Sequence, residues 1–346
     1  MRVLITGGCG FIGTAVTDLL LRRGMRVLNL DKMTPAANPD ALAEWAGTPR
    51  YRVREGDACD LNLVLQMFEE FEPDQVIHCA AENGAGSAAE LGNAPYLQTN
   101  FIGTYTLLEA ARTWWAGRAG DHRFQLISTE DVYGKRLGDA EPAHEGMAFR
   151  PATPSAASKA AACHLAQAWG ETYNIDVMTT ICANNFGPWQ MPENFVPAVI
   201  THGMEGQPVP ILGASGAVRN WAHVQDHAEA IRLVQEHGKT GETYNIGGPV
   251  EHTNANMVHL ICSELDTHMP QNAPHSRMIE MPEVSAPVDE HQAMDSTKIW
   301  RDLRWRPETD FRTGLSDTVQ WYLSHRPWWE AARRRSGADQ SGRRAA

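Results

Sequence analysis

The stretch that decides the fold lies at the N-terminus and reads Arg2-Val3-Leu4-Ile5-Thr6-Gly7-Gly8-Cys9-Gly10-Phe11-Ile12-Gly13. Its apolar start predicts a strand, its glycines predict a tight turn, and residues 14–23 continue with apolar residues at helical spacing. Glycines let backbone amides approach a pyrophosphate, and the N-terminus of the following helix favours its negative charge. The stretch therefore predicts a strand, a turn and a helix that together bind a dinucleotide.

An acidic residue indicates which dinucleotide is bound. A second apolar run, residues 26–30, ends on Asp31, at about the twenty-residue offset expected of a ribose-binding acid. A carboxylate at this position holds the ribose 2′-hydroxyl of NAD and would repel the 2′-phosphate of NADP. Lys32 beside it weakens this preference slightly. We therefore expect NAD as the cofactor.

Size and composition exclude several classes of protein. The chain has 346 residues and a net charge of −12, which argues against nucleic acid and anionic membranes as partners. No apolar run approaches the length of a membrane span, and no signal peptide precedes the first strand. The six cysteines show no metal-ligand spacing. We expect a cytoplasmic protein with reduced thiols and without a metal site.

Strand and helix patterns alternate through the first half of the chain. Such alternation predicts an α/β fold with a Rossmann-type, doubly wound parallel sheet and helices on both faces. Further strands are expected at residues 51–53, 76–79, 124–128 and 177–182, and helices at residues 61–71, 96–115 and 158–173. Ligands bind beyond the carboxyl ends of such strands. The candidate cofactor-binding residues are Gly7, Gly10, Phe11, Ile12, Gly13, Asp31, Lys32, Asp57, Ala58, Ala80, Ala81 and Thr99.

The second half of the chain predicts a smaller substrate-binding lobe, because its pattern loosens into segments rich in proline and glycine. Helices are expected there at residues 195–205 and 254–265. We expect an NAD-binding domain over residues 1–181, with a returning segment at about 218–247. The lobe would then comprise residues 182–217 and 248–328, followed by a disordered polar tail over 329–346.

Several motifs together resemble those of the extended short-chain dehydrogenase/reductases, in the NAD-dependent epimerase/dehydratase family, and most those of the nucleotide-sugar 4,6-dehydratases. The resemblance runs from Met1 to about Trp328. Besides the glycine turn it rests on the segments at residues 78–82, 99–104, 127–134, 157–160, 184–188, 219–221, 224–226 and 241–248. It implies transient oxidation of a hexose at C4 by NAD, loss of water across C5–C6, and return of the hydride to C6.

The resemblance also implies catalytic residues: Thr129, Glu130, Asp131, Ser155 and Lys159. Thr129 matches the hydroxyl that binds the C4 oxygen, and Lys159 matches the lysine that binds the nicotinamide ribose. Glu130 and Asp131 match the acid pair that eliminates water, but the family usually has aspartate first and glutamate second. The exchange moves each reactive oxygen by about one methylene, and a misplacement of about 1 Å can cost roughly a hundredfold in rate.

Ser155 is the largest departure from the family. It lies four residues before Lys159, where the family has a tyrosine that removes the proton of the C4 hydroxyl. A serine hydroxyl is a far weaker acid than a phenol, whose pKa is about 10. Ser155 either binds a substrate oxygen or relays a proton through water, or it takes no part. Tyr133 is a conceivable replacement base, although the family already has a tyrosine there.

The substrate positions depart from the family as well. The segment at residues 83–88 has lost a histidine and its charges, and two cations that the family carries are absent near residues 194 and 285. Arg219 matches the phosphate-binding arginine that remains. The loss of the other two cations weakens the expected affinity for a nucleoside diphosphate. The candidate substrate-binding residues are Glu82, Asn83, Asn185, Glu193, Asn194, Phe195, Pro210, Arg219 and Asn254.

Three functions remain open at this point. The first is a dehydratase acting on a sugar nucleotide or other modified sugar, which the paired carboxylates favour. The second is an epimerase that works through a ketone and an enolate. The third is a catalytically degenerate protein that keeps NAD as a ligand. The resemblance implies a homodimer formed through the helices at 96–115 and 158–173. The tryptophans near the C-terminus are expected to pack the last helix on the substrate lobe.

Overall fold

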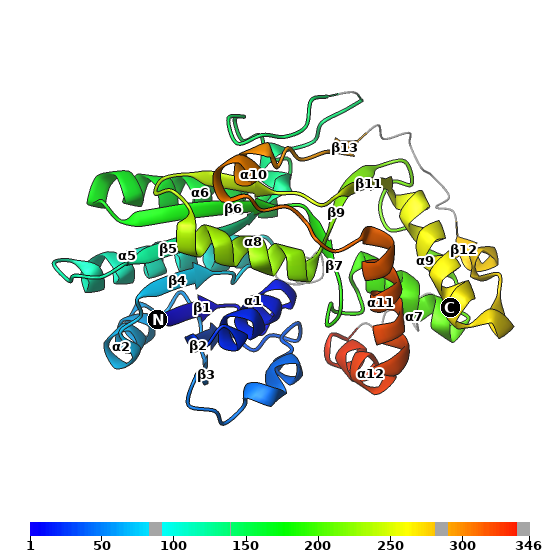
Figure 1. Cartoon of the computed structure of the whole chain (residues 1–346), viewed down its shortest axis with the longest axis horizontal. Helices are drawn as coiled ribbons and strands as arrows, with labels where there is room; N and C mark the ends of the chain where they lie inside the picture. The colour runs from blue at the N-terminus through cyan, green and yellow to red at the C-terminus, as the bar shows by residue number, and fades with distance from the viewer. Residues whose placement is uncertain (83–91, 139, 281–289, 338–346) are drawn as a thin grey trace.

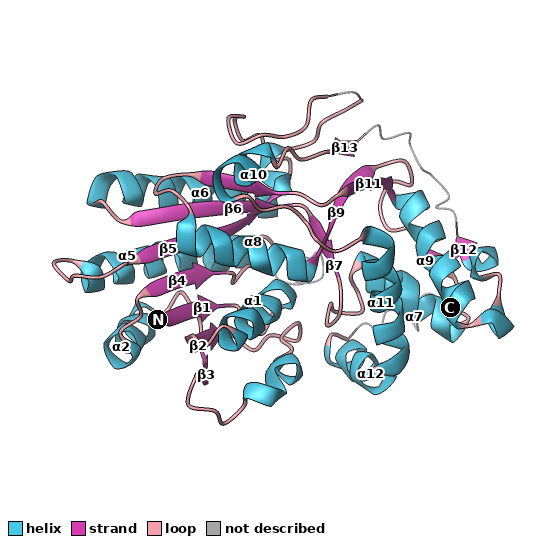
Figure 2. Cartoon of the chain, viewed as in Figure 1, coloured by secondary structure: helices cyan, strands magenta, loops and turns pink. Residues whose placement is uncertain are grey.

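The computed structural model describes residues 1–82, 92–138, 140–280 and 290–337. Its centre is a seven-stranded sheet in the order β10-β6-β5-β4-β1-β2-β3, in which every pair is parallel (Figures 1 and 2). The doubly wound α/β fold predicted from the sequence is therefore confirmed. The strands are β1 (Arg2–Thr6), β2 (Arg26–Asp31), β3 (Tyr51–Glu55), β4 (Gln75–His78), β5 (Arg123–Thr129), β6 (Asp176–Cys182) and β10 (Thr243–Ile246).

Helices cover both faces of this sheet because successive strand residues point to opposite sides. On one face Val3 and Ile5 of β1 pack with α1 (Phe11–Arg22) and α8 (Val224–His237). On the other face Leu4 packs with α2 (Leu61–Phe71), α5 (Gly103–Trp115) and α6 (Pro154–Tyr173). The long apolar runs of these strands are therefore explained by burial on both faces.

The helix expected over residues 96–115 is interrupted at its start. It begins as α4 (Ala94–Tyr96), continues as the π-helical segment η2 (Leu97–Ile102), and only then becomes α5. In η2 the buried Asn100 accepts a hydrogen bond from the amide of Glu82 (2.8 Å) and donates to the carbonyl of Glu82 (3.0 Å) and to Ser158 Oγ (2.9 Å). π-Helical turns often occur at functional sites, and this one ties the end of β4 to α6.

A second layer beside the sheet carries its own core, which includes Phe186, Trp221, Ile261 and Tyr322. Its strands are β7 (Asn184–Phe186), β8 (Val209–Pro210), β9 (Val218–His223), β11 (Val250–Thr253), β12 (Ile279–Glu280) and β13 (His291–Gln292). Its helices are α7 (Phe195–Glu205), α9 (Asn254–His268), α11 (Phe311–Ser324) and α12 (Arg326–Arg335). Short 3-10 segments complete the chain at η1 (Pro39–Trp45), η3 (Glu130–Tyr133), η4 (Pro270–Asn272) and η5 (His275–Met278).

The predicted domain limits need three corrections. The returning segment begins with α8 at Val224, because β9 pairs with β7, β11 and β13 and not with the large sheet. Ile299, on α10 (Thr297–Leu303), and Trp305 pack in the same core as α1 and α8, not in the substrate lobe. The tail was expected to be disordered from residue 329, but residues 329–335 belong to α12, whose Trp329 is fully buried.

Among the C-terminal tryptophans, Trp321, Trp328 and Trp329 pack the last helices on the second layer, as predicted. Trp305 instead packs in the core of the large sheet, and Trp300 is exposed. Trp189, Trp321 and Trp328 lie with ring centroids 4.7–5.2 Å apart. Trp328 also donates from Nε1 to Asn38 Oδ1 at 2.9 Å, so that α12 reaches the loop after β2. This contact joins the two layers on the side of the glycine turn.

Candidate cofactor and active site

The glycine turn between β1 and α1 leaves no room for larger residues. Gly7 has a φ of +69°, and a Cβ there would lie 2.7 Å from the backbone of Ala80. A Cβ on Gly13 would lie 2.0 Å from the carbonyl oxygen of Gly7. The first-turn amides of α1, at Phe11 and Ile12, have no partner within the helix, as at any helix N-terminus. The turn therefore presents backbone donors where a pyrophosphate can approach closely.

Asp31 lies at the end of β2 in the position expected of a ribose-binding acid. Its carboxylate is nearly buried and accepts hydrogen bonds from the amides of Cys9 (2.8 Å) and Met33 (2.9 Å), which fix its orientation. Lys32 pairs with Asp57 at 2.9 Å, and this bond raises the pKa of the lysine. Because Asp57 pairs with Lys32, the lysine is not held against Asp31. The carboxyl end of β2 therefore fits the ribose of NAD rather than the 2′-phosphate of NADP.

The other predicted cofactor residues lie along the same edge of the sheet. Ala58 lies 3.6 Å from a Cβ built on Gly103, and Cys59 donates from Sγ to the carbonyl of Gln98 at 3.0 Å, so that the loop after β3 rests on η2 and α5. Ala81 and Thr99 are half-buried. Gly10 is the N-cap residue of α1. A direct contact of these residues with the cofactor stays a prediction.

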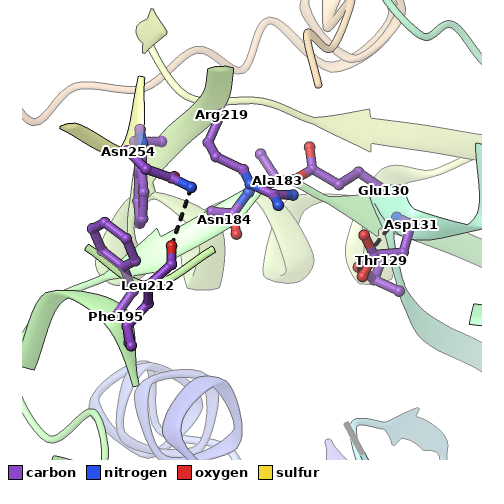
Figure 3. A pocket seen from close by; sticks show the side chains of 10 residues that line it. Thr129, Glu130, Asp131, Ala183, Asn184, Phe195, Leu212, Arg219 and Asn254 are labelled. Carbon is purple, nitrogen blue, oxygen red and sulfur yellow. Dashed lines mark hydrogen bonds between the residues drawn. The ribbon is translucent and has the colours of Figure 1, made fainter. Parts of the chain in front are cut away.

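A cavity of about 300 Å³ opens beside the end of β5 (Figure 3). It brings together Thr129, Glu130, Asp131, Phe195, Arg219 and Asn254, which the sequence analysis had selected separately. Four further lining residues were missed: Ala183, Asn184, Leu212 and Trp221. The signal for Asn184 was available in its position beside Asn185, within a motif that had been recognised.

Glu130 is a buried carboxyl group at the wall of this cavity. Oε1 accepts a hydrogen bond from Asn184 Nδ2, whereas Oε2 is buried without a hydrogen-bond partner among the described residues. Burial, reinforced by the neighbouring Asp131, raises the pKa of Glu130 well above its usual value. An unpaired buried carboxylate is costly, so the arrangement favours a neutral, proton-carrying group.

Asp131 lies in a different environment although it is the next residue. It is exposed to solvent, and Oδ1 accepts a hydrogen bond from Gln292 Nε2 at 3.2 Å. Oδ2 accepts a longer one from Thr129 Oγ1 at 3.4 Å. Two adjacent carboxyl groups in environments this different are suited to opposite roles in proton transfer.

Lys159 and Ser155 lie on one face of α6, with the helix opened by Thr153, whose Oγ1 accepts from the amide of Ala156 at 3.1 Å. Lys159 is buried and donates from Nζ to the carbonyl of Ile127 at 2.6 Å, and burial lowers its pKa. Among the described residues, the hydrogen bond of the Ser155 side chain runs from Oγ to the carbonyl of Glu82 and is long, at 3.4 Å. The serine therefore lies on the correct helix face but is weakly tethered.

Tyr133 does not qualify as a replacement base. Its hydroxyl is buried and donates to Asn245 Oδ1 at 2.8 Å, and burial raises its pKa. A phenol that is harder to ionise and already bonded inside the protein has a structural role. This agrees with the presence of a tyrosine at the same position in the family, where another tyrosine is the base.

Several predicted substrate residues do not line the cavity. Asn185 is buried and its Nδ2 donates to the carbonyl of Ala183 at 2.9 Å, while Pro210 lies in β8, opposite Glu280 of β12. Glu193 and Asn194 are exposed before α7, and Glu82 is held at its backbone by η2. Asn83 and residues 285–289 lie outside the described residues. A direct contact of these side chains with substrate stays a prediction.

Asn254 lines the cavity but also shapes it. Its Nδ2 donates to the carbonyls of Leu212 (3.2 Å) and Ala214 (2.9 Å), which hold the loop after β8 at the cavity rim (Figure 3). Phe195 and Trp221 lie 5.6 Å apart at a tilted angle and form an aromatic wall. The cavity thus has an acidic end at Glu130 and Asp131 and an end made of aromatic and amide groups, with Arg219 between them.

Neither a metal centre nor a membrane span emerges in the described part of the chain. No group of three or more histidine, cysteine or carboxylate side chains there is placed to hold a metal ion. None of the helices of the described residues has the length and apolar character needed to cross a membrane.

The fold and the site define an extended short-chain dehydrogenase/reductase of the epimerase/dehydratase type. Residues 4–318 match the family described as GDP-mannose 4,6 dehydratase, and the chain belongs to this family. It is 39% identical to the dTDP-glucose 4,6-dehydratase of Salmonella typhimurium, over 99% of this chain and 97% of that protein.

Solved structures agree with this assignment. The dTDP-glucose 4,6-dehydratase of Streptomyces venezuelae, solved with NAD bound, superposes with a TM-score of 0.86 at 35% identity, covering 96% of this chain and 100% of that one. The UDP-glucose 4-epimerase of Thermus thermophilus, also in complex with NAD, superposes with a TM-score of 0.80 at 27% identity, covering 94% and 100%.

Proposed function

We propose that the protein is an NAD-dependent dehydratase that removes water from the hexose of a sugar nucleotide. The observation that carries this proposal is the pairing of a buried, proton-carrying Glu130 with an exposed Asp131 in one cavity that also contains Arg219. Elimination needs an acid and a base close together, whereas simple oxidation or reduction needs neither carboxyl group.

The cofactor would be held by the glycine turn, by Asp31 at the ribose and by Lys159 at the nicotinamide end. When bound, NAD supplies the hydride acceptor that makes a ketone at C4 and so acidifies the proton on C5. The neighbouring solved structures contain NAD, and the close packing at Gly7 and Gly13 fits a backbone that must approach a pyrophosphate.

The two carboxyl groups divide the elimination between them. Asp131, which is exposed to solvent, takes the C5 proton, and Glu130 gives its proton to the C6 hydroxyl as that group leaves as water. Asn184 holds Glu130 by one oxygen, so the unpaired Oε2 is the atom that can face the leaving group. Thr129 lies next to both and is placed to bind the C4 oxygen.

The reaction at C4 has to proceed without the usual phenol. Ser155 lies where that phenol would be, with only a long bond to the carbonyl of Glu82. We propose that Lys159, whose pKa is lowered by burial, takes the proton of the C4 hydroxyl as the hydride leaves C4, and that Ser155 contributes little.

The substrate is proposed to be a nucleoside diphosphate sugar of the kind that the relatives are named for. Arg219 would bind the diphosphate, and the aromatic wall of Phe195 and Trp221 would cover the sugar or base. The Salmonella typhimurium relative quoted above, 39% identical, is a dehydratase, whereas the epimerase quoted there is only 27% identical, and this favours a lyase over the epimerase alternative. A catalytically degenerate NAD-binding protein is the remaining alternative, because Ser155 replaces the tyrosine.

We also propose a homodimer formed through α5 and α6. Tyr105 of α5, Tyr173 of α6 and Leu97 of the preceding η2 are exposed, and the Trp169 ring contacts both tyrosines edge-on. Exposed aromatic residues gathered on neighbouring helices are typical of an interface. The six unpaired cysteines suit the cytoplasm, where we expect the enzyme to work.

The test is mass spectrometry of reactions run in D₂O with a panel of sugar nucleotides, beginning with dTDP-glucose. Loss of one water with gain of one deuterium supports the dehydratase. Gain of deuterium without loss of water would identify an epimerase. No change with any substrate, from protein that releases NAD on denaturation, would identify the degenerate binding protein.

A further inference from the structure

A chain of hydrogen bonds links the arginine of the cavity to one of its carboxylates. Arg219, on β9, donates from Nη1 to Gln292 Oε1, and Gln292 Nε2 donates to Asp131 Oδ1 at 3.2 Å. The register of the strands explains the first contact, because Gln292 of β13 lies opposite Arg219 of β9. Three segments far apart in the sequence thus meet at one amide group.

The orientation of this amide is dictated by its neighbours. A guanidinium has only donors and a carboxylate only acceptors, so the oxygen of Gln292 must face Arg219 and its nitrogen must face Asp131. The side chain is almost fully buried, with 6% of its surface exposed. A buried amide that satisfies a cation on one side and an anion on the other is held firmly in one geometry.

The strand that carries Gln292 is anchored independently of the cavity. The Arg136 side chain donates to the carbonyls of Glu141, His291 and Ala293, and the amide of His291 donates to the carbonyl of Arg136 at 2.9 Å. On the same strand His291 Nε2 lies 2.8 Å from Glu251 Oε2. Gln292 is therefore presented to Asp131 from a rigid support, as a positioning group requires.

We infer that Gln292 is a positioning residue that links Arg219 to Asp131 and orients the Asp131 carboxylate. The effect of an anion bound at Arg219 is thereby transmitted to the reacting carboxylate. The guanidinium extends into the cavity toward Asn184 and Glu130 (Figure 3). Because the guanidinium has five N–H donors, it can bind a diphosphate while it keeps its bond to Gln292. The amide then carries polarisation from the cation to its own N–H, which strengthens the bond to Asp131.

This role deepens the proposed function and rests on it for the identity of the reaction. It also accounts for how a short aspartate, with only one long bond to Thr129 at 3.4 Å, is held in a productive position. Binding energy from the diphosphate, which does not react, would be used to place the group that does.

Two variants separate positioning from packing. Gln292→Glu keeps the size and the acceptor for Arg219 but replaces the N–H donor by an oxygen that faces Asp131. Gln292→Met keeps the length and removes both bonds. We expect both variants to lower kcat by about 10–100-fold, in line with the rate lost when a catalytic group is misplaced by about 1 Å, and to change KM much less. Gln66→Met is the matched control, because it makes the same change at an exposed glutamine on α2 that does not line the cavity, and it should change kcat by no more than about twofold.

A double-variant cycle tests the link to Arg219. If Gln292 transmits the effect of Arg219 to Asp131, the effects of Arg219→Lys and Gln292→Met on kcat are not additive. The double variant is then no slower than the slower of the two single variants. Additive losses would overturn the inference. So would a Gln292→Met variant that turns over at the rate of the parent enzyme.

A readout that needs no turnover distinguishes this inference from the proposed function. The carbon-13 resonance of the Asp131 carboxyl group, assigned by its loss in Asp131→Asn, is followed while inorganic diphosphate is added. We expect it to move in the parent protein and not in Gln292→Met. Movement in a protein without dehydratase activity would support the coupling and refute the proposed function. A resonance that does not move in the parent protein would refute the coupling whatever the activity.

Discussion

Asn184 donates a hydrogen bond from Nδ2 to Oε1 of Glu130, and thereby leaves Oε2 as the only atom of this buried carboxyl group without a partner among the described residues. Glu130 begins η3, directly after β5 of the large sheet, and Asn184 begins β7 of the second layer. The contact fixes the orientation of the Glu130 carboxyl group at the wall of the cavity. It also couples the proposed role of Glu130 to a residue that the sequence analysis did not select.

The first prediction concerns this contact. Asn184→Leu removes the donor at similar size, so Glu130 loses its fixed orientation, and we expect kcat to fall by about 10–100-fold. Steady-state kinetics on the substrate found in the D₂O screen measure the change. Asn256→Leu, on the exposed side of α9, serves as the control and should leave the kinetics unaltered. An Asn184→Leu enzyme as fast as its parent would show that the contact has no catalytic role.

The second prediction concerns the pH dependence of stability. Burial raises the pKa of Glu130 in the folded protein above its usual value of 4.5, so the folded state binds more protons than the unfolded state at higher pH. The free energy of unfolding should therefore fall as the pH rises from about 4.5 until it passes the folded pKa, with a slope of up to about 1.4 kcal/mol per pH unit. Glu130→Gln should lack this fall.

Urea unfolding of the parent protein and of Glu130→Gln at a series of pH values measures this change in the free energy of unfolding. The free energy of unfolding of Glu130→Gln, relative to that of the parent protein, should grow with pH above about 4.5 and then level off. A difference between the two proteins that stays constant over the whole pH range would mean that Glu130 titrates normally in the folded state.

The third prediction separates Ser155 from Lys159. Lys159→Ala removes a buried amine at the nicotinamide end and should abolish turnover, whereas Ser155→Ala removes a 3.4 Å bond and should cost less than about threefold, as expected of weak hydrogen bonds. Single-turnover kinetics, followed by the near-ultraviolet absorbance of reduced nicotinamide, provide the measurement. Equal damage from the two substitutions would make Ser155 a catalytic residue.

The fourth prediction concerns the last helix. Trp329 is fully buried and donates from Nε1 to the carbonyl of Tyr322 at 3.1 Å. Trp329→Ala should lower the free energy of unfolding by about 3–5 kcal/mol, the usual cost of removing a large buried side chain. Trp300, on α10, is 43% exposed, and Trp300→Ala should cost less than about 1 kcal/mol. Chemical denaturation of the two variants makes the comparison, and similar losses would contradict the packing of α12.

The sequence by itself determined the sheet, the glycine turn and Asp31, because each depends on local patterns. Alternation of short apolar runs with amphipathic segments is sufficient to predict a parallel sheet, and a Cβ 2.0 Å from a neighbouring oxygen explains why Gly13 is glycine. The helix start at Thr153 and Pro154 could also be predicted from the sequence, since capping involves only neighbouring residues. The assignment of Glu130 and Asp131 as an acid pair came from the resemblance to the dehydratase family and not from a local pattern.

Only the tertiary structure decided what these residues can do. The different environments of Glu130 and Asp131 arise from Asn184, Arg219 and Gln292, which lie 53 to 162 residues further along the chain. The sequence analysis placed the end of the chain in a disordered tail because the arginines of residues 333–335 are polar, but Trp329 finds a buried place against α11. Long-range packing determines burial, and burial determines which carboxyl group keeps its proton.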